Sequence, residues 1–154
     1  MDIDEVLAQA RTGLRRLSPP QAWSAAGRTD SFIVDTRPAF QRCAGEVPGA
    51  IVIERNQLEW RLDPRCEARI PEAEHARIQW IVLCDEGYSS SLAARSLQDL
   101  GLHRSTDVIG GFQAWHAVGM PIVLREPPTP PRRPGEGPSA METAAAEKAL
   151  PQGA

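Results

Sequence analysis

The cysteine at position 84 stands where a thiol can do chemistry. It follows the apolar run 80–83 and opens a short polar loop that leads into a helical pattern over 90–100. A thiol between a strand and a helix faces backbone N–H groups and the positive end of the helix dipole, which favour a thiolate or a bound sulfur anion. A plain core position for the cysteine is the alternative, because a free thiol packs as a small hydrophobic group.

The loop after Cys84 has a composition suited to anion binding. Gly87 allows the backbone to bend so that successive amides point inward. Either of the serines at its end can cap the helix, and either hydroxyl can donate to a sulfur anion. We therefore expect the anion-binding loop to consist of Asp85, Glu86, Gly87, Tyr88, Ser89 and Ser90.

The elements that must position this loop alternate along the chain. Continuously apolar runs predict strands covered on both faces, as in parallel sheets, at residues 32–34, 50–53, 80–83 and 107–109. Ser18, with prolines in the next turn and Gln21 in a capping box, predicts a helix that ends at Gly27. A second amphipathic helix follows Cys84 and ends at Gly101. Strands alternating with helices imply an α/β domain in which function gathers at the carboxyl ends of the strands.

Both ends of the chain differ from its middle. Residues 1–16 predict an amphipathic helix, since apolar residues recur there at helical spacing, and this helix is a candidate lid or partner-facing element. Residues 125–154 are rich in proline and predict a disordered, partly extended tail. The intervening domain, residues 17–124, is long enough to bury a core.

Composition and charge exclude several classes of function. The net charge of −3 gives no electrostatic basis for binding nucleic acid. No apolar stretch approaches the length of a membrane span, and the acidic N-terminus lacks the layout of a secretion signal. The three cysteines form no Cys-x-x-Cys pair and have no histidine at zinc-ligand spacing, so we expect free thiols, a cytoplasmic location, and no metal or other cofactor. The sequence specifies no oligomeric state.

Four motifs, in order, resemble those of the rhodanese-like domains over about residues 17–123. The stretch from Cys84 to Ser89 fits the six-residue active-site loop of that family, cysteine, two variable residues, glycine, one variable residue, then Ser or Thr. Asp35-Thr36-Arg37 resembles an Asp-x-Arg after an early strand, and residues 40–50, with Gly45 and Pro48-Gly49-Ala50, resemble a segment written around a GHIPGA core. The stretch Gly110-Gly111-Phe112-Gln113-Ala114-Trp115, followed by Gly119-Met120-Pro121, resembles the C-terminal signature.

This resemblance implies both a fold and a chemistry. The fold is α/β and rhodanese-like, with a central, mostly parallel sheet of about five short strands and helices on both faces. The implied activity is that of a thiosulfate sulfurtransferase-like transferase: Cys84 attacks the outer sulfur of a donor and holds it as a persulfide. A thiophilic acceptor, cyanide or a protein thiol, then removes that sulfur. The expected partners are a small sulfur donor or a persulfidated carrier protein, and the acceptor.

Charges near Cys84 qualify this expectation. Asp85 and Glu86 repel a dianion and favour the protonated thiol, whereas the helix dipole favours the thiolate, and each effect is about 0.3–1 kcal/mol at a partly exposed site. We therefore expect poor use of thiosulfate, and better use of a neutral donor or of a carrier with a basic patch. Arg37 and Arg55 are candidates for the missing positive charge.

Alternatives remain for the arginines and for the other cysteines. Arg37 and Arg55 either contribute charge to substrate binding or form structural ion pairs, the first with Asp35 and the second with Glu54. The two remaining thiols either resolve a persulfide as a disulfide or are incidental; they are Cys43 and Cys66.

Three other functions compete with sulfur transfer. A non-catalytic rhodanese-like module would bind a partner through the acidic residues beside Cys84, which are Asp85 and Glu86, or through the N-terminal helix or the tail. A cysteine phosphatase needs an arginine six residues after the nucleophile to bind phosphoryl oxygens. Position 90 is serine, so the sequence argues against this function. A peroxide-sensing thiol would need a resolving cysteine near Cys84 in the sequence, and none is present.

Overall fold

The computed structural model describes residues 1–125, 132–135, 137–138 and 143, and the statements below refer to them. The disordered tail predicted at 125–154 consists mostly of residues outside this set. Within the described residues, no helix combines the length and the apolar character needed to cross a bilayer.

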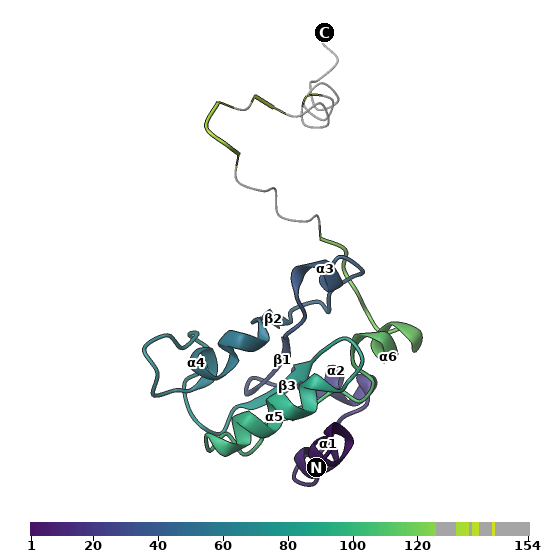
Figure 1. Ribbon diagram of the computed structural model, residues 1–154, viewed down its shortest axis with the longest axis vertical. Helices are drawn as coiled ribbons and strands as arrows, with labels where there is room; N and C mark the ends of the chain where they lie inside the picture. The colour runs from purple at the N-terminus through teal and green to yellow at the C-terminus, as the bar shows by residue number, and fades with distance from the viewer. Residues whose placement is uncertain (126–131, 136, 139–142, 144–154) are drawn as a thin grey trace.

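Four parallel strands form the central sheet (Figure 1). They are β1 (Ser31–Asp35), β2 (Ile51–Val52), β3 (Gln79–Leu83) and β4 (Thr106–Asp107), in the spatial order β2-β1-β3-β4. The α/β fold predicted from the sequence is confirmed, with four strands in place of about five. At the edge beyond β4, Leu17 pairs with Val108 as a single bridge. Pairing stops there because two prolines follow at 19–20, and they begin a helix and lack N–H donors.

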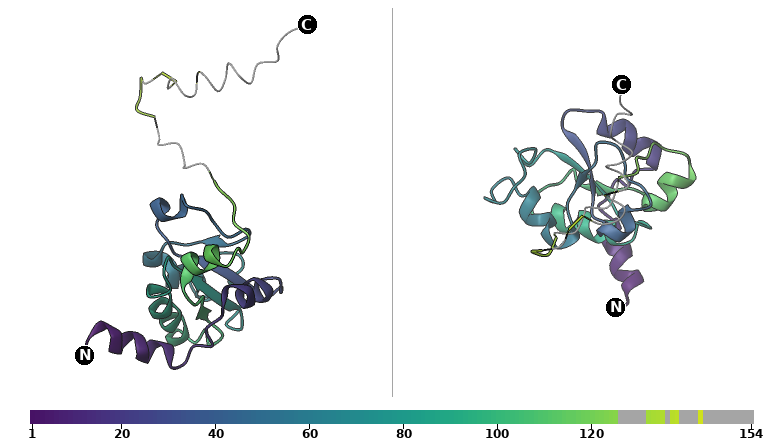
Figure 2. Two further views of the ribbon diagram at one scale, coloured as in Figure 1. Left: turned by 90° about the vertical axis from the view of Figure 1, so that its right-hand side faces the viewer. Right: turned by 90° about the horizontal axis from the view of Figure 1, so that it is seen from above.

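Helices cover both faces of the sheet, as Figures 1 and 2 show. Since neighbouring residues of a strand point to opposite faces, β3 divides its side chains between two apolar clusters. Ile81 and Leu83 pack in one cluster, with α2 (Pro19–Ala26) and α6 (Gly111–Ala117). Trp80 and Val82 pack in the other, with α4 (Leu58–Leu62) and α5 (Ser89–Asp99). Two short elements, α3 (Ala39–Arg42) and the 3₁₀ turn η1 (Arg55–Gln57), complete the connections.

The predicted N-terminal helix is present as α1 (Ile3–Arg11), which packs against α5. It begins with a capping box, in which the Asp2 side chain accepts from the Glu5 amide and the Glu5 side chain accepts from the Asp2 amide. Among its nine residues, only Leu7 and Ala10 are buried. The helix therefore extends from the body of the domain, as the left view of Figure 2 shows, and its contact with the domain is narrow.

Candidate active site

Cys84 lies at the carboxyl edge of the sheet, at the end of an interior strand. It directly follows β3, which lies between β1 and β4, and α5 begins five residues later. Asp35 and Asp107 end the two neighbouring strands at the same edge. The predicted gathering of polar groups at the carboxyl ends of parallel strands is therefore present around this cysteine.

Two backbone N–H groups point at the Cys84 sulfur. The Gly87 amide donates to Sγ at 3.1 Å and the Ser90 amide at 3.4 Å. Both donors lie within residues 85–90, the loop in which the sequence predicts inward amides. The cysteine is 5% exposed, but its sulfur contacts these polar donors and is not enclosed by aliphatic groups alone. The arrangement is suited to holding negative charge on sulfur.

The first turn of α6 fixes the opposite side of the loop. The Phe112 amide donates to the Cys84 carbonyl at 2.8 Å, and the Gln113 amide donates to the Asp85 carbonyl at 3.0 Å. The Gln113 side chain also donates to the Asp85 carboxylate at 3.1 Å. A trans peptide places its N–H opposite its carbonyl. The bonds to the Cys84 and Asp85 carbonyls therefore turn the N–H groups of the same two peptides, those of Asp85 and Glu86, away from α6.

Two glycines allow the loop and α6 to approach so closely. Gly87 has φ +87°, and a Cβ there would lie 2.7 Å from the Gly110 nitrogen. Gly111 has φ +60°, and a Cβ there would overlap the Cys84 carbonyl oxygen. The glycines of both sequence motifs are thus required by backbone contact between the motifs.

The two serines predicted to cap α5 do not do so. Tyr88 is the N-cap and makes no side-chain capping bond. The Ser90 hydroxyl donates to the Asp107 carboxylate at 2.7 Å, as does that of Ser91, also at 2.7 Å, while Ser89 is exposed. Because a buried carboxylate is a stronger hydrogen-bond acceptor than a thiol sulfur, both hydroxyl groups donate to Asp107 and not to Cys84. Ser90 contributes to the sulfur site through its backbone.

Arg37 is an internal part of the domain. Its fully buried guanidinium forms the predicted ion pair with Asp35 at 2.8 Å and donates to the Gly45 carbonyl at 2.8 Å. It also lies 4.0 Å from the centre of the Phe112 ring. These contacts connect the end of β1 to the helix that supports the Cys84 loop.

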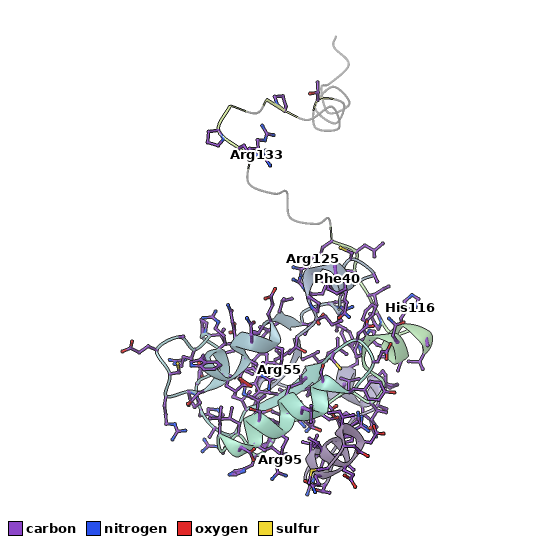
Figure 3. All side chains as sticks on the ribbon, in the orientation of Figure 1. Phe40, Arg55, Arg95, His116, Arg125 and Arg133 are labelled. Atoms are coloured by element: carbon purple, nitrogen blue, oxygen red, sulfur yellow. The ribbon has the colours of Figure 1, made fainter. Side chains whose placement is uncertain are left out.

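Arg55 forms its ion pair with Glu59, not with the predicted Glu54. Glu59 also accepts from the Ser96 hydroxyl of α5, so this ion pair lies beside α5 (Figure 3). A direct role of Arg37 or Arg55 in substrate binding stays a prediction. The cysteines Cys43, Cys66 and Cys84 are free; Cys43 is exposed and Cys66 half-buried.

Sequence reasoning missed three charged residues that contact the loop. Arg11 and Arg16 both donate to the Gly87 carbonyl, at 2.8 and 3.1 Å. Arg16 also forms an ion pair with the buried Asp107 at 2.8 Å. One signal was available in the sequence: Asp107 lies in a predicted buried strand, and a buried carboxylate requires a partner.

Comparison with known proteins agrees with this geometry. A family model described as Rhodanese-like domain matches residues 18–118. The protein described as thiosulfate sulfurtransferase GlpE from Glaesserella parasuis is 30% identical over 108 residues, which cover 70% of this chain and 92% of that protein. A maize protein described as adenylyltransferase and sulfurtransferase MOCS3-2 is 34% identical over 84 residues, or 54% of this chain, but this chain spans only 17% of its length.

Among solved structures, a Rhodopseudomonas palustris protein of unknown function, described as a possible tyrosine phosphatase, has a TM-score of 0.72. It is 30% identical, and the match covers 80% of this chain and 95% of that one. The order of the motifs, the geometry of the Cys84 loop and the family match over residues 18–118 agree with one another. The chain belongs to the rhodanese-like domain family.

Proposed function

We propose that this protein is a sulfurtransferase in which Cys84 carries a sulfane sulfur, as a persulfide, from a donor to a thiophilic acceptor. The observation that carries the proposal is the pair of amides, Gly87 and Ser90, that donate to Sγ. Two fixed N–H groups stabilise an anionic sulfur without reorganisation during the reaction. The same two N–H groups can stabilise the negative charge both on the thiolate and, after sulfur transfer, on the outer sulfur of a persulfide.

The reaction requires no net oxidation. The Cys84 thiolate attacks the outer sulfur of a donor persulfide, a new S–S bond forms, and the donor S–S bond breaks with its electron pair leaving on the donor thiolate. The acceptor thiolate or cyanide then attacks the outer sulfur held on Cys84. The Cys84–sulfur bond breaks in that step, and the enzyme thiolate is regenerated.

The charge of the loop favours a persulfide donor over thiosulfate. Glu86 is exposed, and Asp85 is half-buried with its carboxylate bound by Gln113, so a dianionic donor meets two negative charges at the loop. Because thiosulfate carries two charges and a neutral persulfide none, repulsion acts mainly on thiosulfate. A reducing compartment such as the cytoplasm would keep the three free thiols available for this chemistry.

Phosphate-ester hydrolysis is less well supported, although the R. palustris protein is described as a possible tyrosine phosphatase. That chemistry uses an arginine that grips the phosphoryl oxygens bidentately at the end of the cysteine loop. Position 90 is serine here, and its hydroxyl is bound to Asp107. The guanidinium groups of Arg11 and Arg16 bind the Gly87 carbonyl, which belongs to the loop backbone itself.

A donor panel on the full-length protein tests the proposal. Thiosulfate, mercaptopyruvate, glutathione persulfide and a persulfidated protein are each incubated with the protein, and intact-mass spectrometry measures the addition of one sulfur atom. We expect addition to the parent and none to Cys84→Ser, while Cys43→Ser and Cys66→Ser behave as the parent.

Three outcomes would change the assignment. Sulfur addition to Cys84→Ser at the parent's level would show that another group carries the sulfur. Failure of every donor to load the parent would favour the alternative, a non-catalytic interaction or regulatory module. Hydrolysis of a phosphate ester that depends on Cys84 would favour the phosphatase.

A further inference from the structure

We infer that Arg11 and Arg16, from the segment before the family domain, are positioning residues for the Cys84 site. They belong to a group that we call the arginine–aspartate cluster, whose members are Arg11, Arg16, Ser90, Ser91 and Asp107. The inference deepens the proposed function, since it concerns how the sulfur site is held in its binding conformation. Its central observation concerns the two residues whose amides reach Sγ: Gly87 is bound by this cluster, and Ser90 belongs to it.

The first link runs through Gly87. Its N–H donates to Sγ at 3.1 Å, and its carbonyl accepts from Arg11 Nη2 at 2.8 Å and from Arg16 Nη2 at 3.1 Å. Gly87 has the widest conformational freedom in the loop, so an isolated glycine here would sample many orientations. Two charged donors on its carbonyl restrict that freedom and hold the residue in the orientation that aims its amide at the sulfur.

The second link runs through Ser90. Its amide donates to Sγ at 3.4 Å, and its hydroxyl donates to the buried Asp107 carboxylate at 2.7 Å. Arg16 binds the same carboxylate through Nε at 2.8 Å and Nη2 at 3.2 Å. Arg11 joins this network by donating from Nε to the Ser91 hydroxyl at 3.0 Å. The two arginines therefore connect both sulfur-facing amides to one side-chain network.

The cluster also supplies positive charge to the loop. Two guanidinium groups and one carboxylate leave a net charge of one positive unit beside Gly87, which partly offsets Asp85 and Glu86. This is the role that the sequence suggested for Arg37 or Arg55. Both arginines of the cluster precede residue 18, where the family match begins, so they lie outside the matched segment.

The narrow contact of α1 makes this support easy to lose. Arg11 is the last residue of α1, and that helix buries only Leu7 and Ala10. Undocking of α1 would remove the Arg11 bonds to Gly87 and Ser91 while the sheet stays intact. We therefore expect the order of the loop, and the rate at which Cys84 accepts sulfur, to depend on residues distant from it in sequence.

The test uses the full-length chain with Arg11→Gln, which leaves the Arg16–Asp107 ion pair intact. Arg11→Lys keeps the charge, and Arg15→Gln is the matched control, because Arg15 is exposed and belongs to the same segment. Two quantities are measured: hydrogen exchange of the Gly87 and Ser90 amides by NMR, and the rate of sulfur addition to Cys84 from glutathione persulfide. The first needs no sulfur transfer.

For Arg11→Gln we expect Gly87 amide exchange about tenfold faster and sulfur addition about tenfold slower, as for loss of one charged hydrogen bond. Arg11→Lys should recover part of both effects, and Arg15→Gln should match the parent. Parent-like exchange and sulfur addition in Arg11→Gln would overturn the inference. If the parent accepts no sulfur but the exchange rates change as expected, the proposed function fails and the positioning role stands.

Arg16 is tested with a paired change. Arg16→Gln alone leaves Asp107 buried without its ion-pair partner and is expected to destabilise the fold. The double variant Arg16→Gln/Asp107→Asn removes both charges and keeps hydrogen-bonding groups at both positions. We expect it to fold and to show faster exchange at both Gly87 and Ser90; unchanged exchange at both amides would refute the role of Arg16.

Discussion

Replacement of Gly87 by alanine tests whether the loop needs its close contact with the Gly110–Gly111 backbone. A residue with a side chain at φ +87° is disfavoured by about 1–2 kcal/mol. The added Cβ would also lie 2.7 Å from the Gly110 nitrogen and 3.0 Å from its Cα, and backbone atoms cannot turn aside as a flexible side chain can. Overpacking of this kind costs about 1–3 kcal/mol, so the total loss of unfolding free energy is about 2–5 kcal/mol.

Gly101 provides the matched control for this change. It has φ +91°, and a Cβ there would meet nothing within 4 Å, so Gly101→Ala carries the conformational cost without the clash. Urea denaturation should show that the free energy of unfolding falls by about 1–2 kcal/mol in Gly101→Ala and by a larger amount in Gly87→Ala. Sulfur addition to Cys84, followed by mass spectrometry, should be slowed only in Gly87→Ala. Equal stability of the two variants, with parent-like sulfur addition in both, would refute the reasoning.

Further predictions concern charged groups. Arg37→Met leaves the Asp35 carboxylate buried without its partner, and denaturation should show a loss of about 3–5 kcal/mol; a loss below about 1 kcal/mol would contradict the buried pair. Glu86→Gln removes an exposed negative charge from the loop and should speed sulfur uptake from thiosulfate several-fold at low salt, with little effect in high salt or with a neutral donor. The hydrogen bond from Arg104 holds the pKa of Asp30 below its ordinary value. The stability from this pair is therefore present above the ordinary aspartate pKa and is lost as the pH falls through the lowered pKa; an NMR titration should show the Asp30 midpoint rising in Arg104→Gln.

Local chemistry explains why much of the fold was predictable. Ser18 and Gln21 form the capping box expected from their spacing, and the apolar runs become strands because both faces of the sheet are covered. An inward amide at Gly87 agrees with the expectation from the sequence, because a glycine in this short loop allows the backbone to bend toward the sulfur.

The unpredicted part of the site depends on contacts between distant segments. Arg11 lies 76 residues from Gly87, and Arg16 lies 91 residues from Asp107, so no local spacing brings them together. Local sequence predicts that the serine hydroxyl groups bind the helix end or the sulfur, because no local spacing identifies Asp107 as a competing acceptor. The fifth strand was expected from the family likeness, but the prolines after Leu17 reduce it to one bridge.

The place of β3 in the sheet sets an order in which parts of the site can open. Cys84 follows a strand paired on both sides and packed against both apolar clusters, a region expected to open only with global unfolding. The α1 helix, with two buried residues, is expected to detach at far lower cost. Detachment of α1 would therefore leave the nucleophile in place while the loop exchanges its Arg11 bonds for water and keeps those of Arg16. The reactivity of Cys84 and the stability of the domain would then respond to different perturbations.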